Sequence, residues 1–148
     1  RMNFKITKAQ KEDAPMVAKL AIQMWEDHVL EELAEEFAEL IGSPEAAVFL
    51  GAVDGQAIGF AQCQLRYDYV EGTETSPVGY LEGIFIEENY RKQGYAKQLL
   101  AACETWAKEQ GCTEFASDCE LDNTGSLMFH LSLRFEEENR VICFTKKL

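Results

Sequence analysis

Glu82, Asp118 and His130 are the side chains of this chain whose types and positions suit proton transfer. Glu82 lies inside an apolar run, 81–86, which is typical of a buried strand. Asp118 ends a second short run, at 114–118, and ligands gather at strand ends in sheets of this kind. A carboxylate held there takes a proton from an amine, directly or through water, and a histidine can return one to a leaving group. Each residue also has a structural alternative: a solvent-facing strand residue, a helix or loop cap, and a packed helix residue, respectively.

A turn suited to binding an anion follows the run that contains Glu82. Its sequence is YRKQGYAKQLL, residues 90–100, and apolar residues at three- and four-residue spacing indicate that a helix leaves it. The first N–H groups of a helix have no partner within the helix and lie at the positive end of its dipole, so such a turn binds phosphate groups. The N–H groups that would contact a pyrophosphate belong to Gln93, Gly94, Tyr95, Ala96 and Lys97, and Arg91 and Lys92 would add positive charge. The alternative is an ordinary helix entry with basic surface residues.

The spacing Arg91-x-x-Gly94-x-Ala96 resembles the pyrophosphate loop of the GCN5-related N-acetyltransferases (GNAT), which bind acetyl-CoA. The order of the predicted elements matches that family over nearly the whole chain. The resemblance implies acetyl-CoA as the acetyl donor, with its pantetheine arm between the strands 79–86 and 114–118. The backbone groups that would bind this arm belong to Ile84, Phe85 and Ile86.

The strand before the turn also contains Gly83, at the place where the family commonly has a bulge. Glycine suits the backbone conformation of a bulge. By the same resemblance, a backbone N–H near this point would polarise the thioester carbonyl and stabilise the oxyanion that forms during attack.

Two longer segments, 69–84 and 112–123, are similar to the aminoglycoside 6′-N-acetyltransferases, the resistance branch of the fold. The implied acceptor is the 6′-amino group of an aminoglycoside, which must lose a proton before or during attack. The resemblance gives this proton to Glu82, while Asp118 holds a substrate ammonium group or shares the base role. The remaining residues that would bind the substrate are Glu137, for another ammonium group, and Trp25 and Tyr69, whose rings would cover the sugars or, alternatively, belong to the core.

The last predicted helix departs from the common family pattern at two positions. His130 stands where a tyrosine often protonates the leaving thiolate, and Arg134 replaces a glycine. The related resistance enzymes also tend to have histidine there, so we expect His130 to touch CoA near its sulfur without assigning it as the general acid. The resemblance gives Asn123 a contact with the pantetheine arm, whereas its position before a helix indicates a cap.

The expected order of elements is β-α-α-β-β-β-α-β-α-β-β. Strands are expected at 3–8, 46–53, 57–67, 79–86, 114–118, 134–137 and 140–146, and helices at 13–28, 30–41, 93–110 and 124–131. Asp54-Gly55 indicates a hairpin. This order predicts an α/β (α+β) fold of the GNAT acyl-CoA N-acyltransferase type, with a mixed, mainly antiparallel sheet, flanking helices and a parallel strand–helix–strand centre.

Composition narrows the classes of partner. The formal net charge of −12 argues against nucleic acid and is compatible with a cationic substrate. No run suits a membrane span or a signal peptide, and the five cysteines form no metal-binding spacing, so we expect reduced thiols in a cytoplasmic protein without a metal. The length predicts one domain over residues 1–148, with Arg1, which precedes Met2, as an expression remnant.

The sequence therefore predicts an enzyme that acetylates the 6′-amine of aminoglycosides in a ternary complex with acetyl-CoA. No covalent acyl-enzyme is needed, because the thioester is already activated. The alternatives are an acetyltransferase of the same fold for polyamines or protein amino groups, and a non-catalytic acyl-CoA sensor. A homodimer is expected from the resemblance, and the apolar stretch 141–144 could pair across subunits or stay in its own sheet.

Overall fold

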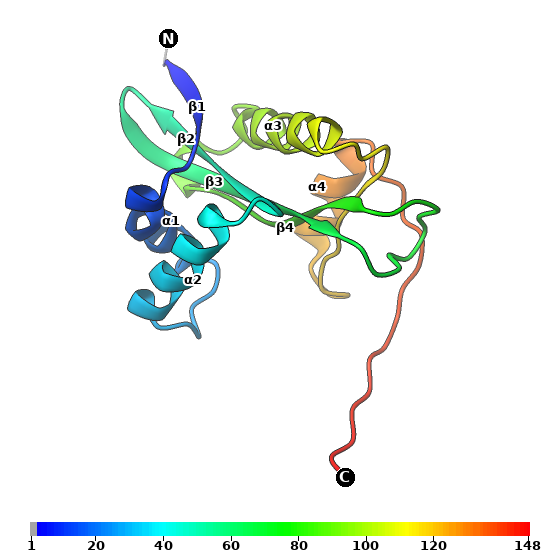
Figure 1. The fold of residues 1–148 in the computed structure, drawn as a ribbon. Helices are drawn as coiled ribbons and strands as arrows, with labels where there is room; N and C mark the ends of the chain where they lie inside the picture. The colour runs from blue at the N-terminus through cyan, green and yellow to red at the C-terminus, as the bar shows by residue number, and fades with distance from the viewer. Residues whose placement is uncertain (1–2) are drawn as a thin grey trace.

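A five-stranded sheet organises the chain, and the computed structural model describes it over residues 3–148 (Figure 1). The strands, which lie in sequence order in the sheet, are β1 (Phe4–Lys8), β2 (Ala46–Val53), β3 (Gln56–Arg66), β4 (Val78–Ile86) and β5 (Phe115–Ala116). Neighbouring strands are antiparallel except β4 and β5, which are parallel. The mixed, mainly antiparallel sheet is thus confirmed. The parallel strand–helix–strand unit is also present, but β5 places it at the edge of the described sheet rather than at its centre. The expectation for Arg1 lies outside the described residues.

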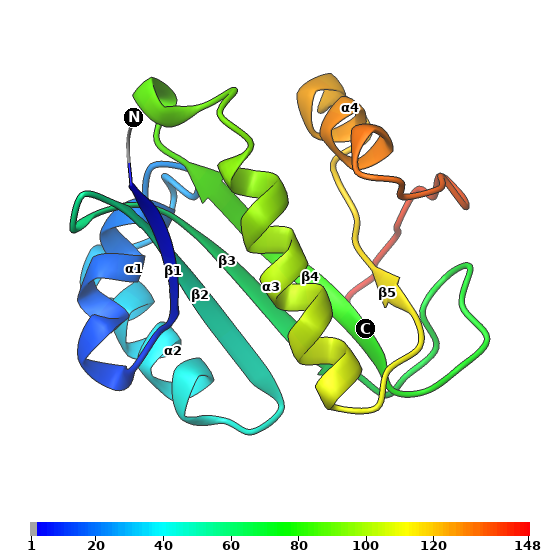
Figure 2. The same cartoon turned by 90° about the horizontal axis from the view of Figure 1, so that it is seen from above.

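Helices cover both faces of the sheet (Figures 1 and 2). On one face lie α1 (Ala14–Ala21) and α2 (Leu30–Gly42), and on the other lies α3 (Tyr95–Glu109), which crosses β2, β3 and β4. The last helix, α4 (Thr124–Ser132), follows β5. Short 3-10 turns precede α1 (Lys11–Asp13) and follow β4 (Glu88–Tyr90).

Hydrophobic core lies on both faces of the sheet, under α1 and α2 on one side and under α3 on the other. Leu99 and Cys103 of α3 are fully buried against Cys63 of β3 and Leu81 of β4. Burying one leucine side chain contributes about 1.5–3 kcal/mol, so this layer fixes α3 relative to β4. The start of α3 is thereby held at the end of β4, which is the arrangement that an anion-binding turn requires.

Two helix boundaries differ from the sequence expectations. The first helix ends at Ala21 because its last hydrogen bonds tighten: Gln23 N–H donates to Leu20 O and Met24 N–H to Ala21 O, at 3.3 and 2.9 Å. The chain then turns, so Trp25 lies in the connection rather than in a helix. The third helix begins at Tyr95 rather than at residue 93 because Gly94 adopts a left-handed conformation, with φ of 84°.

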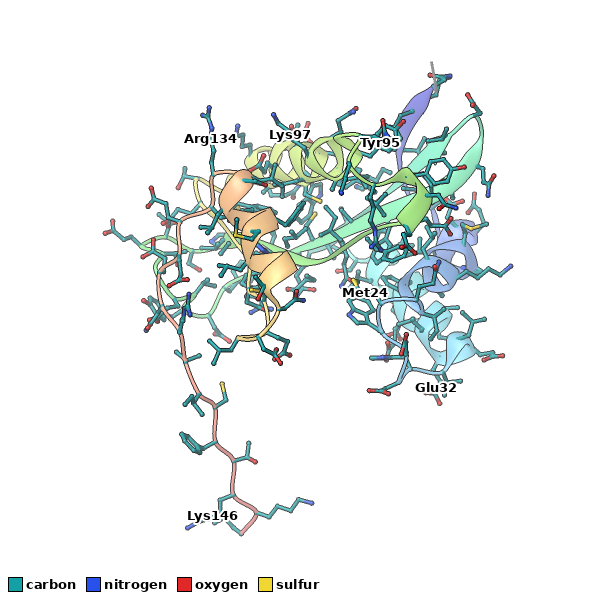
Figure 3. All side chains as sticks on the ribbon, turned by 180° about the vertical axis from the view of Figure 1, so that it is seen from behind. Met24, Glu32, Tyr95, Lys97, Arg134 and Lys146 are labelled. Atoms are coloured by element: carbon teal, nitrogen blue, oxygen red, sulfur yellow. The ribbon has the colours of Figure 1, made fainter. Side chains whose placement is uncertain are left out.

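The two closing strands expected at 134–137 and 140–146 do not form in the described chain. Residues 136–148 are exposed and have no regular secondary structure. The physical reason is the edge that they would join: β5 contains two residues instead of the expected five, and so offers few backbone partners. The segment leaves the body near Glu71, whose carboxylate accepts a 2.6 Å hydrogen bond from Asn139, and Figure 3 shows Lys146 far from the rest of the chain.

Arg134 occupies the turn that ends α4 and has a φ of 70°. Glycine tolerates this left-handed region, whereas other residues are disfavoured there by about 1–2 kcal/mol. The turn is kept because Phe135 N–H donates to His130 O at 3.1 Å and its ring packs on the core. Arg134→Gly should therefore raise the stability by roughly 0.5–1 kcal/mol, after the entropy cost of glycine. Thermal melting should show a Tm higher by about 2–4 °C; a lower Tm would mean that the arginine side chain makes a compensating contact.

Candidate active site

A bulge in β4 sets the geometry of the site. Leu81 pairs with Cys63 and Gly83 pairs with Gln62, so Glu82 is an extra residue without a partner on β3. The bulge predicted at Gly83 is therefore present, with Glu82 as its unpaired residue. Leu81 packs towards α3. Its neighbour Glu82 points to the opposite face, the side of the sheet that α1 and α2 cover.

The backbone of β4 becomes available beyond this point. On one edge β4 pairs with β5, but only at Gly79 and Tyr80. On the other edge it stays paired with β3 as far as Ile86. From Leu81 onward, the edge that faces β5 therefore has no strand partner in the described chain. Figure 2 shows β4 and β5 diverging, with α3 and α4 on either side. The predicted backbone groups of Ile84, Phe85 and Ile86 thus lie along an edge that no strand of the described chain pairs with, although Ile86 O already accepts from Arg91 Nε at 2.7 Å. An extended amide-containing arm can pair with such an edge.

Glu82 is bound by an arginine that the sequence reasoning did not single out. Arg66 of β3 donates from Nε to Oε2 and from Nη2 to Oε1 of Glu82, at 3.1 and 2.9 Å. The Glu82 side chain is 17% exposed. Burial on its own lowers the pKa of Arg66, but the hydrogen bond and charge of Glu82 raise it overall, so the guanidinium stays charged. Each oxygen of Glu82 keeps one lone pair for a water or an amine.

Asp118 lies beside the same arginine. Tyr80 of β4 donates its phenolic hydrogen to Oδ2 of Asp118, and the Arg66 Cζ lies 3.4 Å from the centre of the Tyr80 ring. Burial and the hydrogen bond to Asp118 raise the pKa of Tyr80, so its hydroxyl remains a donor. Glu82 and Asp118, predicted from two separate strands, are therefore brought together around Arg66 and Tyr80.

The turn between β4 and α3 has the conformation of an anion cradle. Lys92 and Gly94 both have left-handed backbones, with φ of 62° and 84°. The N–H groups predicted to contact a pyrophosphate, those of Gln93, Gly94, Tyr95, Ala96 and Lys97, lie in this turn and the first turn of α3. Arg91 folds back instead, and its Nε donates to Ile86 O at 2.7 Å. This contact fixes the turn to the end of β4.

His130 of α4 is held at both ring nitrogens. Nδ1 lies 2.7 Å from the carbonyl oxygen of Ser126, and Nε2 lies 2.8 Å from Oγ of Ser117. A carbonyl only accepts, so Nδ1 carries a hydrogen, while Nε2 shares a hydrogen bond with the Ser117 hydroxyl. These contacts support the packed alternative, in which His130 ties α4 to the segment after β5.

Asn123 caps α4, as its position in the sequence indicated. Its Oδ1 accepts a 3.0 Å hydrogen bond from Ser126 N–H. This uses the carbonyl side of the amide, and the amide hydrogens remain for another partner. The predicted contact of Asn123 with the pantetheine arm stays a prediction.

Trp25 lies over the bulge. A Cβ added to Gly83 would stand 2.9 Å from Cζ2 of Trp25, so only glycine allows the ring this close to β4. The ring is stacked with Phe37 and meets Phe60 edge-on, with both centroids at 6.3 Å. It also lines a pocket of about 260 Å³ together with Gln62 and residues of α2. Trp25 therefore has one side in the core and one side beside Glu82's strand.

For Tyr69 and Glu137, the other predicted substrate residues, no hydrogen bond or ion pair with Glu82 or Asp118 is present within residues 3–148, and their roles stay predictions. Tyr69 is 76% exposed in the loop between β3 and β4. Glu137 lies in the exposed C-terminal segment, where Arg140 donates to it at 2.7 Å. The loop of Tyr69 is anchored by Glu114, whose Oε1 accepts from the hydroxyl of Thr75 and from the N–H groups of residues 74 and 75. These bonds, the one from the Thr75 hydroxyl above all, lower the pKa of Glu114.

Three further polar residues of the site were missed: Arg66, Tyr80 and Ser117. Tyr80 stands two residues before Glu82, and strand alternation could have placed both on one face. Arg66 could be found only from the register between β3 and β4, and Ser117 only from the position of α4.

The structure also bears on metal binding, membrane spanning and the state of the cysteines. Within residues 3–148, no group of metal-ligating side chains could hold an ion, and no helix is long and apolar enough to cross a membrane. All five cysteines are free thiols. Cys63, Cys103 and Cys112 are buried in the core, whereas Cys119 and Cys143 are exposed.

The amino-acid sequence of this chain is similar to those of known acetyltransferases. The sequence profile of the acetyltransferase (GNAT) family matches residues 14–135. An aminoglycoside N(6′)-acetyltransferase type 1 from Serratia marcescens is 42% identical over 130 residues, 87% of this chain and 89% of that protein. A second, from Stenotrophomonas maltophilia, is 39% identical and covers 97% and 93%.

Solved structures of an aminoglycoside N-acetyltransferase are also similar to this chain over nearly its whole length. Aminoglycoside N-acetyltransferase AAC(6′)-Iy in complex with CoA has a TM-score of 0.96 at 38% identity, covering 100% of this chain and 97% of that chain. The same enzyme with the bisubstrate analogue CoA-S-monomethyl-acetylneamine has a TM-score of 0.94, also at 38% identity, covering 99% of each chain. The chain therefore belongs to the acetyltransferase (GNAT) family and, within it, to the aminoglycoside N(6′)-acetyltransferases of type 1.

Proposed function

We propose that this protein transfers the acetyl group of acetyl-CoA to the 6′-amino group of aminoglycosides. The observation that carries the proposal is the pairing of two carboxylates, Glu82 and Asp118, beside the free edge of β4 that leads to the turn at Gly94. One end of this arrangement suits a phosphate-bearing arm and the other suits a polycationic acceptor.

In the proposed reaction, each group of residues has a separate role that follows from its position. The turn at 91–97 binds the pyrophosphate of acetyl-CoA, and the edge of β4 pairs with its pantetheine arm. Glu82 accepts the proton that the amine releases, directly or through a water on its remaining lone pairs. Asp118 is exposed and holds a substrate ammonium group, while Trp25 covers a sugar ring. The amine then attacks the thioester directly, forming the amide and releasing the CoA thiolate.

A thiol-release assay with acetyl-CoA tests this proposal. The acceptors are kanamycin, tobramycin and gentamicin, with spermidine and an amine-terminated peptide as comparison amines. Efficient turnover of kanamycin and tobramycin supports the proposal. Turnover of only spermidine or the peptide would keep the cofactor and overturn the acceptor, and binding of acetyl-CoA without turnover of any amine would favour a sensor.

The free thiols support the cytoplasmic location expected from the cysteine pattern.

We also propose that the protein is a homodimer in which the segment 140–146 pairs with a second copy of the chain. Val141, Ile142 and Phe144 are 66%, 75% and 87% exposed, although they are adjacent and apolar. The segment leaves the body of its own chain (Figures 1 and 3), and its backbone has no strand partner there. Pairing with a second copy satisfies these backbone groups and covers the apolar side chains.

Light scattering on the full chain and on variants tests the dimer. The full chain should have about twice the monomer mass of 16.7 kDa, and Ile142→Asp with Phe144→Asp should reduce it to the monomer value. Lys146→Asp is the control, because it changes charge in the same segment without touching the apolar stretch. A monomeric wild-type protein, or a dimer that survives both aspartates, would overturn this proposal.

A further inference from the structure

Tyr80 links the two carboxylates of the site through different parts of one side chain. Its hydroxyl donates to Asp118, and its ring face carries the Arg66 guanidinium, which in turn binds both oxygens of Glu82. The residue is 5% exposed. Val70, Val78 and Ala116 pack around it and fix the ring.

The strand register explains why this contact forms. Tyr80 pairs with Ala116 in the parallel ladder between β4 and β5. Asp118 lies two residues after Ala116, so its side chain returns to the face on which the Tyr80 ring lies. Beyond Ala116 the regular ladder ends. Two side-chain hydrogen bonds still connect the diverging strands: Ser117 Oγ donates to Leu81 O at 3.4 Å, and the hydroxyl of Tyr80 donates to Asp118.

Asp118 is an exposed carboxylate on a segment without regular secondary structure. Such a side chain is free to rotate, and fixing it costs entropy when a ligand binds. A buried hydroxyl that donates to Oδ2 holds the carboxylate beforehand and leaves Oδ1 for another donor. The group formed by Arg66, Glu82 and Asp118 carries a formal charge of −1, which favours a cationic ligand.

We propose that Tyr80 is a positioning residue for acceptor binding, whose hydroxyl holds Asp118 in the orientation that receives a substrate ammonium group. This inference rests on the proposed function. The competing explanation is that the hydroxyl only satisfies its own hydrogen-bonding requirement inside the fold. The two explanations make different predictions. If the hydroxyl positions Asp118, its effect on ligand affinity requires Asp118; if it serves only the fold, its effect does not.

A double-mutant cycle on affinity separates them. Calorimetry with kanamycin, in the presence of CoA, gives Kd for the wild type, Tyr80→Phe, Asp118→Ala and the double variant. Tyr80→Phe keeps the ring and should weaken kanamycin binding by about tenfold, the size of one hydrogen bond to a charged group. With alanine at position 118, Tyr80→Phe should have no further effect. In turnover, Tyr80→Phe should raise KM for kanamycin and leave KM for acetyl-CoA unchanged.

Tyr67→Phe is the matched control, because Tyr67 also donates to a carboxylate, Glu45, at 2.6 Å but outside the site. It should bind kanamycin as the wild type does. Equal weakening by Tyr80→Phe in both backgrounds, or none in the wild type, would overturn the inference. If the wild type itself neither binds nor acetylates an aminoglycoside, the proposed function fails instead.

Discussion

Glu82→Gln is expected to lower kcat for aminoglycoside acetylation by about 10²–10⁴-fold, the usual contribution of a positioned general base. Glutamine has nearly the same shape and keeps an oxygen for Arg66, but it cannot take the proton of the attacking amine. The fold should be unchanged, since Glu82 is the extra residue of a bulge rather than part of the core. Steady-state kinetics at saturating acetyl-CoA, together with a melting curve, measure both effects.

Glu109→Gln provides the control, because it makes the same chemical change at the exposed end of α3. It should leave kcat as in the wild type. A Glu82→Gln variant with nearly normal kcat would show that another group, with Asp118 as the first candidate, receives the proton. Loss of activity accompanied by a lower Tm would point to the salt bridge with Arg66 rather than to proton transfer.

Gly94→Ala should raise KM for acetyl-CoA by about tenfold or more, and should cost about 1 kcal/mol of stability. The cost in stability arises because Gly94 has a φ of 84°. Apart from Gly94 and its two chain neighbours, no atom of residues 3–148 lies within 4 Å of the added methyl group. The effect on KM would therefore arise from the ligand side, where the pyrophosphate approaches the backbone.

Gly111→Ala separates these two effects. Gly111 has a φ of 92°, also has open space around an added Cβ, and lies just beyond the opposite end of α3. It should lose a similar amount of stability while KM for acetyl-CoA stays at the wild-type value. If both variants change KM equally, strain in α3 rather than contact with the pyrophosphate explains the result for Gly94.

The sequence predicted the parts of the site that depend on local pattern. The apolar run ending at Ile86, the glycine turn and the helix after it form one continuous unit, so spacing alone located the end of β4 and the start of α3 to within two residues. Asp54 and Gly55 adopt the left-handed conformations of a two-residue hairpin, as their residue types indicated. Glu82 and Asp118 stand in or at the end of recognisable strands, and the resemblance to the aminoglycoside 6′-N-acetyltransferases assigned their roles.

Contacts that depend on register and on chain pairing could not be read in the same way. The bulge at Glu82 turns its side chain towards Arg66, and the sequence contains no signal of which β3 residue lies opposite. His130 was identified, but its hydrogen bond to Ser117 joins two segments whose relative position the sequence does not give. The apolar stretch 141–144 has the composition of a strand, but the strand predicted from it is absent from the described chain. A strand also needs an edge to pair with, and the edge at β5 is two residues long.

The central claim is that the 6′-amine is the acceptor, and a pair of substrates tests it most directly. Neomycin carries an amino group at the 6′ position, whereas paromomycin carries a hydroxyl there and is otherwise the same molecule. With acetyl-CoA, the protein should acetylate neomycin, with mass spectrometry placing one acetyl group on the ring that bears the 6′-amine, and should leave paromomycin unmodified. Comparable turnover of paromomycin would contradict the account, because the acetyl group would then be going to a different amine.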